Sequence, residues 1–204
     1  MLLALIVASV IGVFAQQATT ATTEDGRKIL LYPDGTWRLL KTPVSEPSTA
    51  RAYQRPTEAK LFVKAPKGPF GVWINQQKWK QDAPVEEDAS KITFRHKKGD
   101  AYAMLIAERL SIPTESLKKM VLAEAKGAAP DVRVISEEKR TLNGKKILCL
   151  KMGATIENIP FVYYGYYYSG SDGTLQVVTY TGTNFFDEFK SDFEEFLNGT
   201  QIGQ

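Results

Sequence analysis

Few residues in this chain of 204 could do chemistry, since it holds one histidine, His96, and one cysteine, Cys149. Zinc and copper centres need several His, Cys or carboxylate ligands close together, so we expect no metal and no other cofactor. His96 stands between Arg95 and the pair Lys97-Lys98, a setting that predicts an exposed loop and not a catalytic base. Cys149 lies in the apolar run KKILCLKMG, where a lone cysteine is more often a small buried side chain than a reactive thiol.

The other candidates for catalysis are weaker. Glu86-Glu87-Asp88 are consecutive carboxylates, which point apart in a loop and are usually solvated. The sequence has no phosphate-binding loop and no dinucleotide-binding glycine pattern. Ser171-Asp172-Gly173 lacks the alternating carboxylates of a calcium loop and predicts a turn. We therefore expect that the protein is not an enzyme.

The densest aromatic cluster is the run FVYYGYYY at residues 161–168. If this run is a strand, alternate side chains lie on opposite faces of a sheet, so both faces are aromatic. One interpretation, which we favour, is ordinary sheet construction, because aromatic residues have high strand propensity and pair well across strands. The other is a ligand-binding or partner-binding surface, for which the candidate residues are Tyr164, Tyr166, Tyr168, Trp79 and Trp37.

The N-terminus has the pattern of an export signal. Residues 2–14 are apolar and uncharged, and Val13-Phe14-Ala15 offers small residues at a cleavage point. We expect residues 1–15 to be a signal peptide and the mature protein to be periplasmic or secreted, with no integral membrane span. The apolar run is shorter than the roughly 20 residues that cross a bilayer. No Lys or Arg precedes it, so an uncleaved anchor or a start further upstream remains an alternative.

Three short segments follow the signal. The polar run QQATTAT predicts disorder at residues 16–22. Residues 23–40 predict a β-hairpin, because two β-prone segments flank the turn sequence Pro33-Asp34-Gly35. Residues 41–58 are rich in proline and polar side chains and predict a linker.

The hairpin also carries a resemblance. Its run DGRKILLYPDGTW resembles a short motif found just after the signal peptide in many exported bacterial proteins. The resemblance implies a bacterial envelope or secreted setting and no particular chemistry. An isolated hairpin is only marginally stable in water, so we expect this one to dock on the main domain or on another molecule.

Residues 59–199 predict one α+β domain, followed by a tail at 200–204. Strand-like segments precede and follow a helix expected at 114–126, and Asn143-Gly144 is a strong two-residue hairpin signal. The segment TNFFDEFKSDFEEFLNGT predicts a closing helix, because its phenylalanines recur every three or four residues. Short turns between strands indicate antiparallel pairing, so we expect an antiparallel sheet of about six to seven strands packed with two amphipathic helices.

This order of elements, with a tryptophan near the start and a helix at the end, resembles the PsbP-like fold, which DcrB-type envelope proteins of bacteria share. The resemblance covers most of residues 59–199. It implies a non-catalytic role, because known members of the fold are mostly accessory subunits, partner-binding proteins and envelope proteins.

These observations together predict the class of function. The net charge is +3, and no basic run is interleaved with stacking aromatics, so we expect no nucleic-acid partner. We expect an exported envelope protein that binds a protein partner through a sheet face or the N-terminal hairpin. The alternative is a protein that binds a small lipid or glycan, with Trp79 and the face of Tyr164, Tyr166 and Tyr168 as its site.

Overall fold

The computed structural model describes residues 19–22, 28–33, 35–39, 52–83 and 89–203. The chain forms two compact units, residues 1–44 and 45–204. The expected signal peptide and residues 41–51 of the expected linker lie outside the described residues. In the part of the chain that is described, no helix is both long and apolar enough to cross a bilayer.

A small antiparallel sheet makes up the described part of the first unit. It contains β1 (Thr19–Thr22), β2 (Lys28–Leu31) and β3 (Trp37–Leu39), in that order. The expected hairpin is β2–β3, and Gly35 takes a positive φ of 81° in its turn. β1 corrects the expected disorder over residues 19–22, while residues 16–18 lie outside the described residues. Its threonines have high strand propensity, and β2 supplies the pairing partner that an isolated polar segment lacks.

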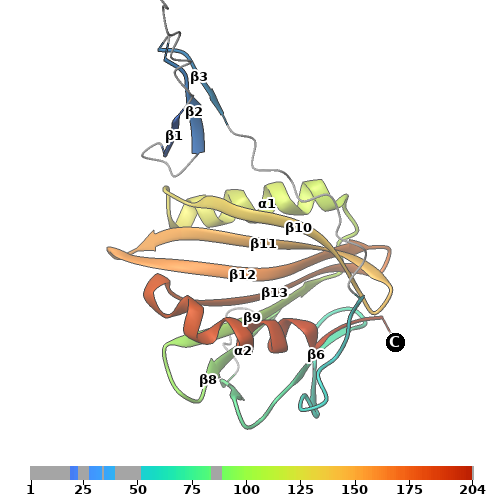
Figure 1. Cartoon of the computed structure of the whole chain (residues 1–204). Helices are drawn as coiled ribbons and strands as arrows, with labels where there is room; N and C mark the ends of the chain where they lie inside the picture. The colour runs from blue at the N-terminus through green and yellow to red at the C-terminus, as the bar shows by residue number, and fades with distance from the viewer. Residues whose placement is uncertain (1–18, 23–27, 34, 40–51, 84–88, 204) are drawn as a thin grey trace, which may run out of the picture. The chain divides into compact units, whose positions relative to one another are not determined.

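The second unit is built on an eight-stranded sheet with the order β4-β10-β11-β12-β13-β9-β8-β7 (Figure 1). Seven of these strands pair antiparallel, and β4 joins the edge of β10 in parallel. The α+β class and the antiparallel sheet are therefore confirmed. β4 falls inside the segment expected to be a linker and corrects its C-terminal end. The strands are β4 (Ala52–Tyr53), β7 (Trp79–Gln81), β8 (Lys91–His96), β9 (Ala101–Glu108), β10 (Arg133–Leu142), β11 (Lys145–Ile156), β12 (Ile159–Gly170) and β13 (Gly173–Gly182).

Two-residue turns fix the register of the central strands. Asn143 and Gly144, with φ angles of 48° and 79°, join β10 to β11 as the sequence predicts. Glu157 and Asn158, with φ angles of 49° and 66°, join β11 to β12 in the same way. Because a shift of one residue would move every side chain to the other face, these turns decide which residues lie in the core.

A second sheet of three strands has the order β14-β6-β5. It consists of β5 (Leu61–Lys64), β6 (Phe70–Ile74) and β14 (Thr200–Ile202). β14 corrects the tail expected at 200–204, since the chain turns at Gly199, pairs with β6 and buries Ile202. At this junction the Trp73 N–H donates to the Gly199 carbonyl over 2.8 Å.

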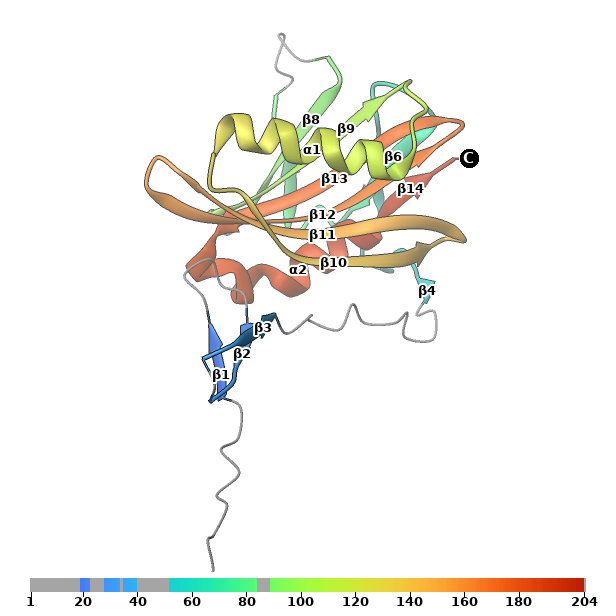
Figure 2. The ribbon, with the colours of Figure 1, turned by 90° about the horizontal axis from the view of Figure 1, so that it is seen from above.

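Two helices cover opposite faces of the eight-stranded sheet (Figure 2). α1 (Thr114–Ala128) packs Leu117 and Val121 over a smaller core that includes Leu150. α2 (Phe186–Asn198), which follows a 3₁₀ turn at Thr183–Phe185, closes the larger core. Its buried residues have the spacing that predicted the helix, and they are Phe186, Phe189, Phe193, Phe196 and Leu197.

Candidate functional site

The candidate residues for an aromatic binding surface lie mostly inside the protein. Tyr164, Tyr166 and Tyr168 are buried in the larger core, and Trp79 is only 2% exposed. They do not form an exposed binding surface, because α2 covers this face of the sheet. Their role is the one that sheet construction predicts. Trp37 lies on β3 in the first unit and is 61% exposed.

The hydroxyl of Tyr166 has polar partners inside this core. Arg140 Nη1 donates to it over 2.9 Å, and it donates in turn to Asn198 Oδ1 over 2.8 Å. The Arg140 guanidinium also lies 4.6 Å from the ring centroid of Tyr53. Cys149 is buried, as its sequence context predicts. Burial raises the pKa of its thiol to about 11, so a nucleophilic thiolate does not form at neutral pH.

The opposite face of the sheet carries three stacked, partly exposed tyrosines. Tyr163 on β12, Tyr180 on β13 and Tyr102 on β9 are direct cross-strand neighbours. The ring centroids of Tyr163 and Tyr180 are 5.5 Å apart, with an interplanar angle of 24°. Those of Tyr180 and Tyr102 are 5.3 Å apart, with an angle of 22°. We call these three residues the tyrosine row.

The tyrosine row lies on the same face as α1 but is only partly covered. Within the row, only Tyr163 packs against the two smaller cores beneath and beside α1. Partial burial raises the pKa of Tyr163 and Tyr180, because a phenolate would be poorly solvated there. Their hydroxyls are therefore protonated at neutral pH and can donate as well as accept hydrogen bonds.

The sequence reasoning missed this row, although part of the signal was present. Tyr163 faces Tyr180 because Ser171 and Asp172 form a two-residue turn, with Gly170 directly opposite Gly173. Seven positions along each strand from the pair of Gly170 and Gly173, the register places Tyr163 opposite Tyr180. No local signal gives the pairing of Tyr180 with Tyr102, because a helix and three strands separate β9 from β13 in the chain.

His96 is a further correction, because it ends β8 and is buried, not exposed in a loop. Its Nδ1 accepts the N–H of Lys98 over 3.3 Å. Its Nε2 lies 3.1 Å from Asp192 Oδ2 on α2, without the alignment of a regular hydrogen bond. Lys78 Nζ lies 2.8 Å from Asp192 Oδ1 and also contacts Glu195. Burial lowers the pKa of His96 and outweighs the opposing attraction of Asp192, so the imidazole is neutral at neutral pH.

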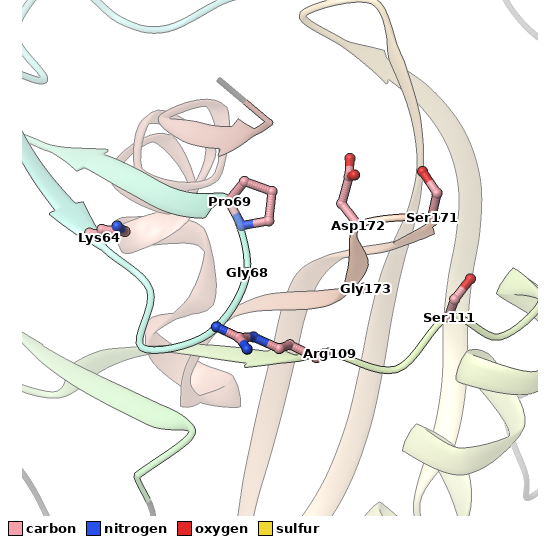
Figure 3. A pocket seen from close by; sticks show the side chains of 8 residues that line it. All are labelled: Lys64, Gly68, Pro69, Arg109, Ser111, Ser171, Asp172 and Gly173. Atoms are coloured by element: carbon pink, nitrogen blue, oxygen red, sulfur yellow. The ribbon is translucent and has the colours of Figure 1, made fainter.

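A pocket of about 590 Å³ lies among three turns of the second unit (Figure 3). Lys64 and Arg109 bring positive charge to it, and Asp172 brings a carboxylate. In Figure 3 the Arg109 side chain reaches beneath the turn at Gly68. The Asp172 side chain points away from the Arg109 guanidinium. The remaining lining residues are Pro69, Ser111, Ser171 and Gly173. Across the described ranges, no group of three or more His, Cys, Asp and Glu residues is placed to hold a metal ion.

No protein-family model and no curated protein matches the sequence. Among solved structures, a Pseudomonas aeruginosa protein of unknown function matches with a TM-score of 0.47 and 7% identity, over 93% of this chain and 99% of that one. PsbP of the cyanobacterium Synechocystis sp. PCC 6803 matches with a TM-score of 0.44 and 12% identity, over 96% and 98%. LpqN of Mycobacterium tuberculosis, involved in cell envelope biogenesis, matches with a TM-score of 0.42 and 9% identity, over 66% and 83%.

A PsbP is thus among the structures that this chain matches, in agreement with the resemblance at residues 59–199. At such identities the likeness concerns the fold alone, and with TM-scores below 0.5 it carries no argument about function.

Proposed function

We propose that the protein is an exported, non-catalytic protein of the bacterial envelope that binds a protein partner through the tyrosine row. The row carries the proposal, because three stacked and partly exposed tyrosines lie on a sheet face that α1 covers only in part. Export is supported by the apolar run at residues 2–14, and the bacterial setting by the motif DGRKILLYPDGTW.

The geometry of the row suits a polypeptide better than a glycan. A sugar ring stacks on an open aromatic face, but both faces of Tyr180 are occupied by Tyr163 and Tyr102. The row instead offers ring edges and hydroxyl groups, which match the amide groups and apolar side chains of a polypeptide. Tyrosine is enriched at protein interfaces because it combines apolar area with a polar end.

The burial of the reactive side chains supports a non-catalytic role. The side chain of His96 is only 1% exposed, and it borders Trp79 and Phe189, not solvent. Cys149 is buried with a raised pKa. A general base or a nucleophile has to reach its substrate, and neither of these residues can do so in this structure.

A second candidate function is the binding of a small lipid or glycan, and the pocket in Figure 3 is the observation that favours it. Its volume of about 590 Å³ lies within the range of small-molecule sites. Its lining is mixed in charge, since it includes the cations Lys64 and Arg109 and the carboxylate Asp172. A small-molecule adduct that disappears in the variant Arg109→Ala would favour this function over the first.

Photo-crosslinking in the protein's own cells tests the first proposal. A photoreactive amino acid replaces Tyr102 in one variant and Leu110 in a matched control, since Leu110 is 45% exposed just beyond the end of β9. We expect one discrete polypeptide adduct from the Tyr102 position and none from the Leu110 position. No adduct at the Tyr102 position, or the same adducts at both positions, would show that the row is not a partner site.

A further inference from the structure

We infer that the partner of the tyrosine row presents an acidic polypeptide segment, which lies across the row toward β8 and β7. This inference rests on the proposed function and adds the chemistry of the partner. The supporting observation is the register of the sheet, in which two cationic side chains lie next in line after the tyrosine row.

The continuation follows from direct cross-strand pairs. Tyr102 on β9 is opposite Arg95 on β8, and Arg95 is opposite Lys80 on β7. Directly opposite residues of antiparallel strands lie on the same face. Arg95 and Lys80 therefore extend the tyrosine row on the α1 face, and we call these two residues the cationic end. Both are exposed.

The charge at this end is predominantly positive. Lys91 is opposite Ile106, four positions from Tyr102, so it adds a third cation to the same face. Glu108 lies on this face two positions beyond Ile106 and is paired with Lys67. Asp82 is the acidic side chain that contacts the cationic end, with Oδ1 3.5 Å from Arg95 Nη2. An exposed ion pair of this kind contributes little to stability. Arg95 can therefore exchange Asp82 for a carboxylate of the partner. The acidic residues Glu86, Glu87 and Asp88 lie outside the described residues. They are the same in every variant compared, so they cannot account for a difference between variants.

The position of α1 favours a polypeptide segment over a membrane surface. α1 packs on the same face as the row, and a helix with its side chains is about 10 Å across. A flat bilayer would meet the helix before it met the sheet beside it. A polypeptide segment can lie on the sheet beside the helix, with apolar groups and amides on the tyrosines and carboxylates on Arg95 and Lys80.

The test uses a fluorescent synthetic peptide that alternates Glu with Leu, and a matched peptide with Gln in place of Glu. The variant Lys80→Glu/Arg95→Glu is compared with Lys119→Glu/Lys126→Glu, which changes the net charge equally on exposed positions of α1. We expect the Glu peptide to bind the wild type at least about tenfold more tightly than the Gln peptide, with an affinity that falls as salt rises. The first variant should abolish this preference, and the control variant should keep it.

Three results would overturn the inference. They are equal binding of the two peptides, a preference for Glu that survives in Lys80→Glu/Arg95→Glu, and binding of phosphatidylglycerol vesicles through Arg95 and Lys80 without binding of the peptide. The crosslink from the Tyr102 position, measured in the same charge-reversal variant, separates the two proposals. If that crosslink persists unchanged, a partner binds the row but is not acidic. If the crosslink is absent from the wild type as well, the proposed function fails too.

Discussion

Tyr166 and His96 are two buried polar side chains that differ in how completely their polar atoms are hydrogen-bonded. The Tyr166 hydroxyl is satisfied on both sides, by Arg140 and by Asn198. His96 is satisfied at Nδ1 by the Lys98 N–H, while its Nε2 has only the close carboxylate of Asp192. The first residue therefore contributes to stability through its hydrogen bonds, and the second makes stability depend on pH.

The variant Tyr166→Phe should lower the free energy of unfolding by about 1–3 kcal/mol, because it removes the hydrogen bonds of a buried hydroxyl with the half-buried side chains of Arg140 and Asn198. Urea denaturation measures this change. Tyr168→Phe is the matched control, since the Tyr168 hydroxyl takes part in neither bond, and it should change stability by less than about 0.5 kcal/mol. Equal losses in the two variants would mean that these hydrogen bonds do not stabilise the core.

The free energy of unfolding should fall in mild acid because of His96. Burial lowers its pKa in the folded protein, whereas the unfolded chain takes up the proton near the ordinary value of 6.5. The stability is therefore complete above pH 6.5 and is lost as the pH falls through that value toward the lower folded pKa. The loss is at most about 1.4 kcal/mol per pH unit.

Urea denaturation of the wild type and of His96→Gln above and below pH 6.5 measures this effect. The variant keeps Asp192, Glu195 and Lys78, so only the imidazole differs between the two proteins. We expect the wild type to lose more stability than the variant on acidification. The same loss in both would assign the acid sensitivity to other groups.

At the scale of elements, the junction between α2 and β6 depends on a glycine. A Cβ on Gly199 would lie 2.0 Å from the Trp73 carbonyl oxygen, closer than any real contact. The Gly199 carbonyl also accepts the Trp73 N–H, so the two segments cannot separate without losing that bond. The end of α2 and the start of β14 are held against β6 because residue 199 has no side chain.

Gly199→Ala should therefore destabilise the protein by about 2 kcal/mol or more, through backbone displacement and loss of the bond to Trp73. The control is Gly127→Ala within α1, where an added Cβ has no neighbour within 4 Å. That substitution should stabilise by about 0.5–1 kcal/mol, because alanine restricts the unfolded chain and favours the helix. A thermal melt of both variants decides the matter, and a neutral Gly199→Ala would contradict the tight junction.

The elements differ in how far the sequence could predict them. α2 and the hairpin at Asn143-Gly144 follow from local patterns, because side-chain spacing and turn chemistry act over a few residues. β14 could not be predicted, because three residues after a helix form a strand only when β6 offers an edge. His96 could have been placed correctly, since Ile92, Phe94 and His96 alternate along β8, but its charged neighbours indicated a loop.

At the scale of the whole molecule, the two faces of the eight-stranded sheet have separate roles in our account. The α2 face holds the larger core, in which the tyrosines that were candidates for a binding surface are buried. The α1 face leaves the tyrosine row and its cationic end partly open. Substitutions in the row should therefore reduce partner binding with little loss of stability, whereas substitutions under α2 should do the reverse.

Native mass spectrometry, on protein purified gently from the envelope of its own cells, tests the central claim most directly. The wild type is compared with Tyr102→Ala, after a thermal melt shows that the variant is folded. Our account predicts a co-purified polypeptide on the wild type that is lost from the variant. A bare wild-type monomer, or a small-molecule adduct that Tyr102→Ala leaves in place, would contradict it.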